Sequence, residues 1–212
     1  MRFTNRDEAA RLLAEQLLRF KGQKPLILAI PRGGVPMARV IAERLGCQFD
    51  VVLVRKLRTP EQPELAMGAV DEAGHVYTYG HKAAVSPELY AEEVAAQVAE
   101  IRRRRRLYSA MQPAIPATGH TAIIVDDGIA TGTSMVAAIR AVRAQRPLRI
   151  VVAVPVAARD SLDLSRSYAD EVVCLHTPRV FFAVGDFYDD FFAVADSTVV
   201  ELLEGRVAQP GL

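Results

Sequence analysis

The chain has 212 residues, half of them hydrophobic, which is enough to bury the core of one domain. Its 26 basic residues nearly balance its 25 acidic ones, which excludes a strong overall attraction to nucleic acid or an anionic membrane. The two cysteines and four histidines lack metal-ligand spacing, and no apolar run approaches the roughly 20 residues of a spanning helix. The N-terminus, MRFTNRDEAARLL, is too charged for a signal peptide. We therefore expect a cytoplasmic protein.

The first predicted elements are a helix, a strand and a second helix. Asn5 followed by Glu8 resembles a capping box at a helix N-terminus. The run LILAIP (26–31) predicts a buried strand, which RGG ends before a helix closed by Gly46. The apolar face expected for the first helix comprises Ala9, Leu12, Leu13, Leu17 and Phe20.

Further apolar runs predict more strands, with helical segments between most of them. They are FDVVLVRKL (49–57), AIIVDDG (122–128), RIVVAVPV (149–156) and EVVCLH (171–176). Continuous apolar runs that alternate with helices are typical of a mostly parallel sheet covered by helices on both faces. The fold class predicted is therefore α/β.

Two stretches interrupt this alternation. Residues 57–68 hold two prolines among polar residues, which indicates a loop. Ser86-Pro87 then predicts the start of a long helix with an apolar face and an arginine run, RRRRR (102–106), at its end. That run is either a nucleic-acid contact or, as we favour, a solvated helix end in which Glu100 pairs with Arg104. The apolar face comprises Tyr90, Val94, Val98 and Ile101.

The stretch VDDGIATGTS (125–134) carries the strongest functional signal. Asp126 and Asp127 follow a buried strand, at the end where open α/β sheets present their ligands. Residues 128–134 then turn into a helix, so the backbone N–H groups of 131–134 form an anion site with nearby hydroxyls. The nucleotide-binding patterns GxxxxGK[ST] and GxGxxG are both missing from the chain.

These residues resemble the phosphoribosyl pyrophosphate (PRPP) signature of the type I phosphoribosyltransferases, and the whole chain resembles a bacterial branch of predicted phosphoribosyltransferases. The resemblance implies that Asp126 and Asp127 are catalytic and hold the ribose hydroxyls. It also implies a loop that binds the 5′-phosphate, made of Ala130, Thr131, Gly132, Thr133 and Ser134.

Other segments extend the resemblance and its expectations. The turn PRGG (31–34) looks like the family's pyrophosphate loop, and Arg32, Gly33, Arg55 and Lys56 are the expected pyrophosphate ligands. Residues 57–68 are either a lid over PRPP or a fixed connection. We expect one domain over 1–212, with a core at about 22–178. A hood at about 179–212 plus the N-terminal helix and an inserted helix at about 87–109 complete it.

The stretch VFFAVGDFYDDFF (180–192) holds six of the fourteen aromatic residues of the chain. One interpretation is core packing by Phe181, Phe182, Phe187, Tyr188, Phe191 and Phe192. The other is a hood that contacts the acceptor base, as the resemblance implies. The acceptor-base residues expected there are Phe182, Val184, Gly185 and Phe187.

The function predicted is transfer of 5-phosphoribosyl from PRPP to a nitrogenous base, with Mg²⁺ as cofactor and a role in nucleotide metabolism. No dedicated metal site is expected, because Mg²⁺ would arrive with PRPP, with Asp126 as its one candidate protein ligand. The alternatives are a non-catalytic PRPP sensor on the same fold and a purely structural protein. Partners are PRPP and an unidentified base, without membrane or nucleic acid, and a homo-oligomer is left open.

Overall fold

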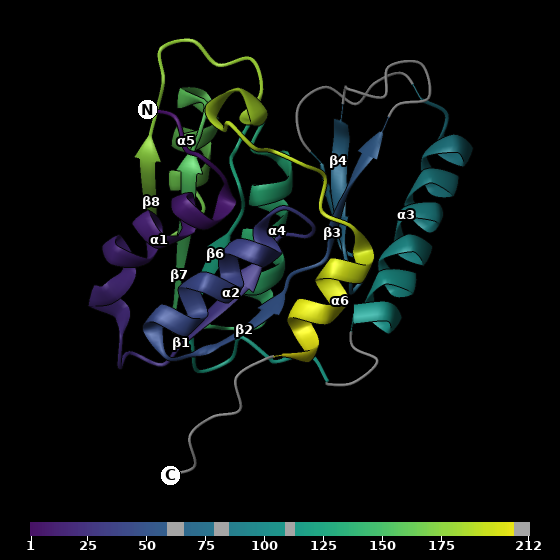
Figure 1. Ribbon diagram of the computed structural model, residues 1–212. Coiled ribbons are helices and arrows are strands. Elements are labelled where there is room, and N and C mark those ends of the chain that lie inside the picture. The colour runs from purple at the N-terminus through teal and green to yellow at the C-terminus, as the bar shows by residue number, and fades with distance from the viewer. Residues whose placement is uncertain (59–65, 79–84, 109–112, 206–212) are drawn as a thin grey trace.

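Five parallel strands form the central sheet of the molecule, in the order β2-β1-β6-β7-β8 (Figure 1). The computed structural model describes residues 1–58, 66–78, 85–108 and 113–205. Each strand overlaps a predicted apolar run. The strands are β1 (Pro25–Ala29), β2 (Gln48–Val51), β6 (Thr121–Val125), β7 (Arg149–Val156) and β8 (Glu171–His176).

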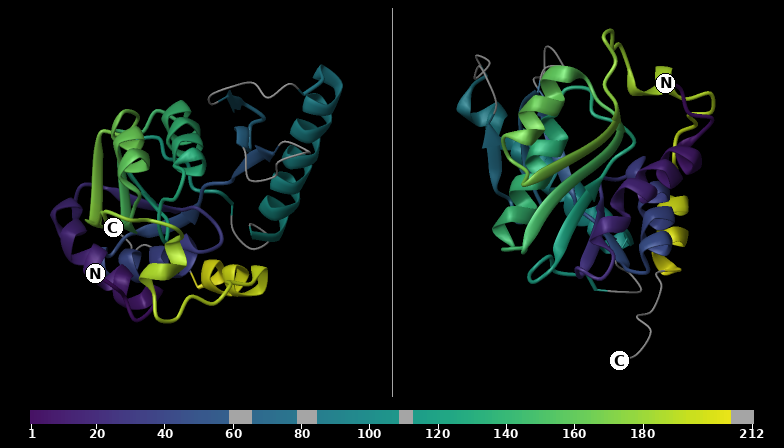
Figure 2. Two further views of the ribbon diagram at one scale, coloured as in Figure 1. Left: turned by 90° about the horizontal axis from the view of Figure 1, so that it is seen from above. Right: turned by 90° about the vertical axis from the view of Figure 1, so that its left-hand side faces the viewer.

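Helices cover both faces of this sheet, as predicted. Helices α1 (Arg6–Leu17) and α2 (Gly34–Leu45) pack on one face, and α4 (Thr133–Ala144) and α5 (Arg159–Arg166) on the other (Figure 2). Each face has its own hydrophobic core. Ile27 and Ile123 point into the core shared with α1 and α2, whereas Leu26 and Ile124 point into the core shared with α4 and α5. Because successive side chains alternate between two buried faces, the strands read as unbroken apolar runs.

A second, antiparallel sheet was not predicted. It contains β3 (Val54–Arg58), β4 (Ala66–Asp71) and β5 (Val76–Thr78), and it lies between α4 and the long helix α3 (Pro87–Tyr108) (Figure 2). The prediction of a single strand over 49–57 was therefore wrong. The chain leaves the parallel sheet after Val51, although Val52 still donates a hydrogen bond to the Ala29 carbonyl over 2.9 Å.

The predicted loop at 57–68 is shorter in the structure, because its two ends belong to β3 and β4. Residues 59–65, which carry the lid hypothesis, lie outside the described residues. The predicted apolar face of α3 is confirmed: Ile101 is fully buried, and Tyr90, Val94 and Val98 pack against the same core. In the described part of the chain, no helix combines the length and apolar character needed to span a membrane.

Helix α1 begins at its predicted cap but differs in detail. The Asn5 side chain accepts a hydrogen bond from the Glu8 amide over 3.0 Å, while Glu8 accepts from the Thr4 amide instead of from Asn5. Leu12 is exposed, which corrects its place on the apolar face. Phe20 is buried but belongs to a short 3₁₀ turn, η1 (Leu18–Phe20), that follows the helix.

Residues 177–195, called the hood segment below, cross above the carboxyl ends of β6 and β7 (Figure 1). They contain the 3₁₀ turn η2 (Val184–Phe187) and lead into α6 (Asp196–Glu204), which packs on α2 and α3. Phe3 pairs with this segment: its amide donates to the Phe187 carbonyl over 2.8 Å, and its carbonyl accepts from Asp189 over 2.8 Å. The N-terminus is thereby attached to the hood segment.

The strand order places a topological switch point between β1 and β6. The connection from β1 leads to β2 on one side, whereas the connection from β6 leads to β7 on the other. The two following turns therefore diverge and leave a crevice at their carboxyl ends, which is the usual ligand position in open α/β sheets.

We expect Ile101→Ala to lower the free energy of unfolding by roughly 2–5 kcal/mol, because it leaves a cavity between α3 and the small sheet. Leu107 on the same helix is 37% exposed, so Leu107→Ala is the matched control and should cost less than about 1 kcal/mol. Urea unfolding curves measure both values. Equal losses for the two variants would mean that α3 is not held by this contact.

Candidate active site at the ends of β1 and β6

Asp126 and Asp127 directly follow β6, and their side chains do different things. The Asp126 carboxylate accepts a hydrogen bond from the Asp127 amide over 2.9 Å and lines a pocket of about 170 Å³. Asp126 keeps some contact with solvent but is surrounded by protein atoms. Burial, and then the neighbouring Asp127 carboxylate, raise the pKa of Asp126 well above its ordinary value.

The Asp127 carboxylate is held by Arg6 from the first turn of α1. Arg6 Nε and Nη2 lie 2.9 and 2.8 Å from Asp127 Oδ2, and both side chains are only 14% exposed. Arg6 Nη1 also donates to the Phe192 carbonyl over 2.8 Å, and its guanidinium stacks 3.9 Å from the centre of the Phe191 ring. The hydroxyl of Tyr188 donates to the Asp127 carbonyl over 2.7 Å. One acid therefore faces the pocket, while the other joins α1 to the hood segment.

The turn after β1 approaches the acids closely, which requires glycine. A Cβ atom on Gly33 would overlap Asp127 Oδ2, and one on Gly34 would lie 2.5 Å from the Val125 carbonyl oxygen. The peptide bond between Pro31 and Arg32 is cis. The predicted pyrophosphate turn thus lies directly against the end of β6.

The predicted 5′-phosphate loop is anchored where it begins. Ile129 pairs with the chain after β7, and the Ser161 hydroxyl donates to the Ala130 carbonyl over 2.5 Å. Gly132 then adopts φ +76°, a left-handed conformation that suits glycine, and α4 begins at Thr133. The first amide groups of a helix lack partners within it, so the start of α4 presents N–H donors beside the hydroxyls of the loop.

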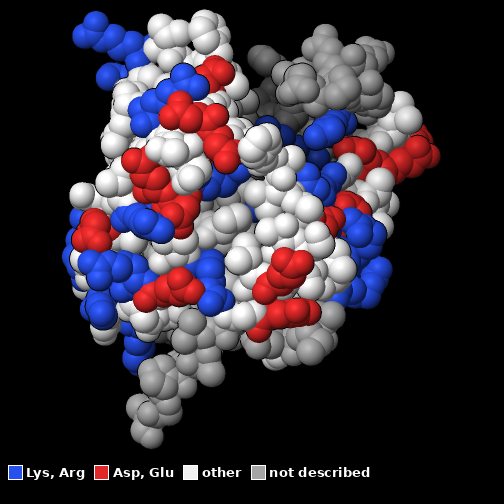
Figure 3. Space-filling model, in the orientation of Figure 1, with Lys and Arg blue, Asp and Glu red and all other residues white. Residues whose placement is uncertain are grey.

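Lys56 joins this loop, whereas Arg55 does not. Lys56 Nζ lies 3.3 Å from Thr131 Oγ1 and lines the same pocket as Asp126, Gly132 and Ser134. Because neighbouring residues of a strand point to opposite faces, Arg55 faces α3, where its Nε donates to Gln97 over 2.5 Å. Basic side chains gather in and beside the hollow between the hood segment and α3 (Figure 3).

The expected acceptor residues differ in their surroundings. Val184 lines the 170 Å³ pocket, and a Cβ atom on Gly128 would lie only 2.6 Å from its Cγ1, so it closes the pocket from above. The rings of Phe187 and Phe181 pack together with their centres 5.3 Å apart, and Gly185 lies against the ring of Phe191. Phe182 is 86% exposed.

The core-packing interpretation of the aromatic stretch is wrong for two of its rings. Tyr188 is buried and stacks on Phe191 with ring centres 4.9 Å apart, as that interpretation expects. Phe182 and Phe192, by contrast, are 86% and 80% exposed.

Arg6 and Tyr188, which both contact Asp127, were not among the predicted site residues. Arg6 lies in the first turn of α1, where a cation opposes the helix dipole, and this unfavourable placement was an available signal. Tyr188 carried no comparable signal, because a tyrosine in an aromatic stretch does not reveal its hydrogen-bond partner.

Three arginines of the run at the end of α3 pair with acids of the same molecule. Arg103 and Arg104 both contact Glu100, which lowers the pKa of Glu100 to about 2. Arg105 donates to Glu72 over 2.6 Å. Charges that are satisfied in this way are less available to nucleic acid, which agrees with the favoured interpretation for Glu100 and Arg104.

Comparison with known proteins places the chain in a family. The model of the phosphoribosyl transferase domain matches residues 4–191. The chain belongs to the phosphoribosyl transferase domain family. Within this family, two Mycobacterium tuberculosis proteins, from strains CDC 1551 and H37Rv, are provisionally named phosphoribosyl transferases. Each is 42% identical over 206 residues.

This phosphoribosyl transferase domain also matches a solved structure closely. The crystal structure of the protein TT1426 from Thermus thermophilus is 41% identical in sequence, with a TM-score of 0.83. The match covers 96% of this chain and 98% of TT1426. For the mycobacterial relatives the match covers 95% of this chain but 46% of theirs, so the chain spans about half the length of the curated relatives.

Asp126→Asn should stabilise the free protein at neutral pH. The pKa of the Asp126 carboxyl group is higher in the folded than in the unfolded state. At neutral pH, where the group ionises, it therefore lowers the free energy of unfolding, and this cost disappears at low pH, where the group is protonated in both states. We therefore expect the variant to melt a few degrees higher at pH 7–8, since about 1 kcal/mol shifts Tm by roughly 2–4 °C in a domain of this size. The difference should shrink as the pH falls toward 4. Calorimetry over this range measures it, and a variant that melts lower at pH 8 would contradict it.

Proposed function

We propose that this domain transfers the 5-phosphoribosyl group of PRPP to a nitrogenous base and releases pyrophosphate. The observation that carries the proposal is that one pocket is lined by Asp126, Lys56 and the amide-rich loop, through Ala130, Thr131, Gly132 and Ser134. A ribose 5-phosphate offers hydroxyl groups at one end and a dianion at the other, and this pocket offers complementary groups at both ends. Membership of the phosphoribosyl transferase family supports the same assignment.

In the proposed reaction, a ring nitrogen of the base bonds to C1 of the ribose as the bond from C1 to the pyrophosphate oxygen breaks. The bonding electron pair leaves with pyrophosphate, and the proton of the base is released. Positive charge develops on the ribosyl centre, and the carboxylate of Asp126 stabilises it electrostatically while it accepts a hydrogen bond from a ribose hydroxyl. Lys56 and the start of α4 hold the phosphate, which fixes C1 relative to the base.

The oxygen ligands at this site suit Mg²⁺ that is bound together with pyrophosphate. No group of three or more His, Cys, Asp or Glu side chains in the described part of the chain could hold a metal. Mg²⁺ commonly binds through one or two carboxylates plus substrate phosphates, and Asp126 presents one carboxylate to the pocket. When bound, Mg²⁺ would neutralise part of the leaving-group charge.

The chemistry is tested by pyrophosphate release from PRPP and Mg²⁺ across a panel of purine and pyrimidine bases. Asp126→Asn should abolish release by loss of ribose binding and charge stabilisation, although it stabilises the fold. If calorimetry shows PRPP binding but no base leads to pyrophosphate release, the result would favour the alternative function, a non-catalytic PRPP sensor. A protein that binds neither PRPP nor ribose 5-phosphate would refute the proposal.

The exposed ring of Phe182 is proposed to stack on the acceptor base. Stacking of a base on an aromatic ring contributes on the order of 1–3 kcal/mol, so Phe182→Ala should raise the acceptor KM by roughly ten- to a hundredfold. Phe192 is similarly exposed in the same segment, and Phe192→Ala is the matched control. Steady-state kinetics with the active base measure both. Equal effects of the two variants would assign the base contact elsewhere.

A further inference from the structure

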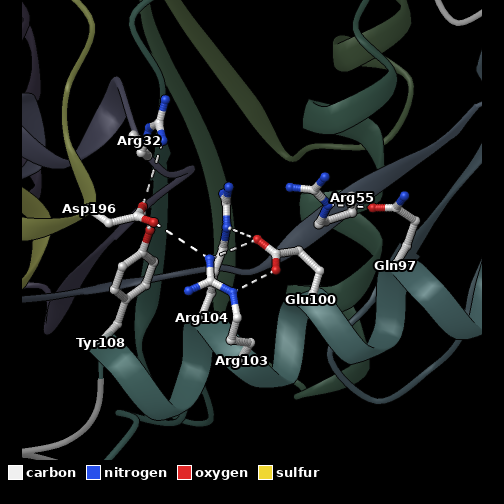
Figure 4. A network of polar contacts seen from close by, with 8 residues as sticks. All are labelled: Arg32, Arg55, Gln97, Glu100, Arg103, Arg104, Tyr108 and Asp196. Atoms are coloured by element: carbon white, nitrogen blue, oxygen red, sulfur yellow. Dashed lines mark hydrogen bonds and ion pairs between the residues drawn. The ribbon is translucent and has the colours of Figure 1, made fainter.

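Four arginines from three parts of the chain gather beside the pyrophosphate turn (Figure 4). Arg32 belongs to that turn, Arg55 to β3, and Arg103 and Arg104 to α3. We call these four residues, with Glu100 and Asp196, the guanidinium cluster. In Figure 4 the terminal nitrogens of Arg104 point away from α3, into the space between Arg32 and Arg55.

The guanidinium cluster carries more positive charge than its own acids neutralise. The cluster has four guanidinium groups and two carboxylates, which is an excess of two positive charges among the described residues. Arg58 and Glu93 also influence Arg55, and because they carry opposite charges the excess stays at two when they are counted. The partner of Arg55 Nε is the neutral amide of Gln97. Arg104 uses its Nε to bind Glu100 over 2.8 Å, and its side chain is 19% exposed.

The position of Arg55 among these cations is electrostatically unfavourable in the free protein. Burial, and then the like charge of Arg104, lower the pKa of Arg55. An excess of guanidinium groups suits an anion of the phosphate type, because the planar guanidinium matches its geometry and can donate two hydrogen bonds to it. The location beside Arg32 indicates which anion this is.

Asp196, the first residue of α6, lies between Arg32 and Arg103 in the guanidinium cluster. Its Oδ1 lies 3.8 Å from Arg32 Nη1 and accepts a hydrogen bond from the Tyr108 hydroxyl over 2.6 Å, while its Oδ2 lies 3.6 Å from Arg103 Nη2. The hydrogen bond from Tyr108, together with nearby arginines, lowers the pKa of Asp196. An ionised carboxylate therefore interacts with Arg32 in the free protein, at a distance long enough for a stronger anion to compete.

We propose that the inserted helix α3 completes the leaving-group site, in which Arg104 binds the pyrophosphate of PRPP together with Arg32 and Arg55. In the same proposal, Asp196 is an internal counterion of Arg32 that the pyrophosphate displaces. This inference rests on the proposed function, because it requires that PRPP is the ligand. It gives α3 a direct part in the site, beyond covering the small sheet.

Calorimetric titrations with PRPP, pyrophosphate and ribose 5-phosphate, each with Mg²⁺, test the inference without knowledge of the acceptor. Arg104→Gln should weaken the binding of PRPP and of pyrophosphate by roughly ten- to a hundredfold, which is the effect of losing a hydrogen bond between charged groups. It should leave ribose 5-phosphate within about twofold, because that ligand lacks the pyrophosphate. Asp196→Asn should have the opposite effect and increase the affinity for PRPP, since it removes the competing charge but keeps the shape of the side chain.

Arg106→Gln is the matched control, because Arg106 is exposed on the same helix and the variant loses the same charge. It should leave all three affinities unchanged. The inference is overturned if Arg104→Gln weakens no ligand, or weakens ribose 5-phosphate as much as PRPP, or if Asp196→Asn weakens PRPP. Should Arg104→Gln fail to fold, the sign of the Asp196→Asn effect still decides. Wild-type protein that binds neither PRPP nor ribose 5-phosphate would instead refute the proposed function.

Discussion

The carboxylate of Asp127 is the point at which separate parts of this molecule meet. Arg6 brings α1 and the hood segment to it, and Gly33 brings the turn after β1 to within reach of its Oδ2. The hydroxyl of Tyr188 binds its carbonyl. Buried charge pairs are strongly destabilised when one partner is removed, because the other remains desolvated. The geometry of the crevice therefore depends on an ion pair between residues 121 positions apart in the sequence.

Two adjacent acids with different surroundings allow the site to separate two demands. Asp127 is compensated by Arg6, so it can fix the hood segment without a cost from unpaired charge. Asp126 lies in the pocket with a raised pKa, and a ligand that supplies hydroxyl groups or a metal ion would restore its ionised form. Stability is thus given up at the residue that lines the pocket, as is common at functional sites.

The sequence was sufficient for the parallel sheet because its strands are buried on both faces and appear as continuous apolar runs. The same property concealed the boundary between β2 and β3, since Val52 and Leu53 are buried where the chain passes between the sheets. Strands β4 and β5 are short, and Gly68 lies within β4 where a Cβ atom would clash with the Tyr77 carbonyl oxygen. The positions of Asp126 and of the loop at residues 130–134 followed from the local order of residues along the chain. The contacts of Arg6 and Asp196 depend on tertiary packing, which no local period reports.

Strand β3 supplies Arg55 to one side of the small sheet and Lys56 to the other. The alternation of a strand has a period of two, so a shift of β3 by one residue against β4 would reverse both side chains. A flexible ammonium group would then face α3, and a planar guanidinium would face the start of α4. The register of β3 is consequently subject to a parity rule: a shift of two residues preserves the chemistry of both faces, and a shift of one exchanges it.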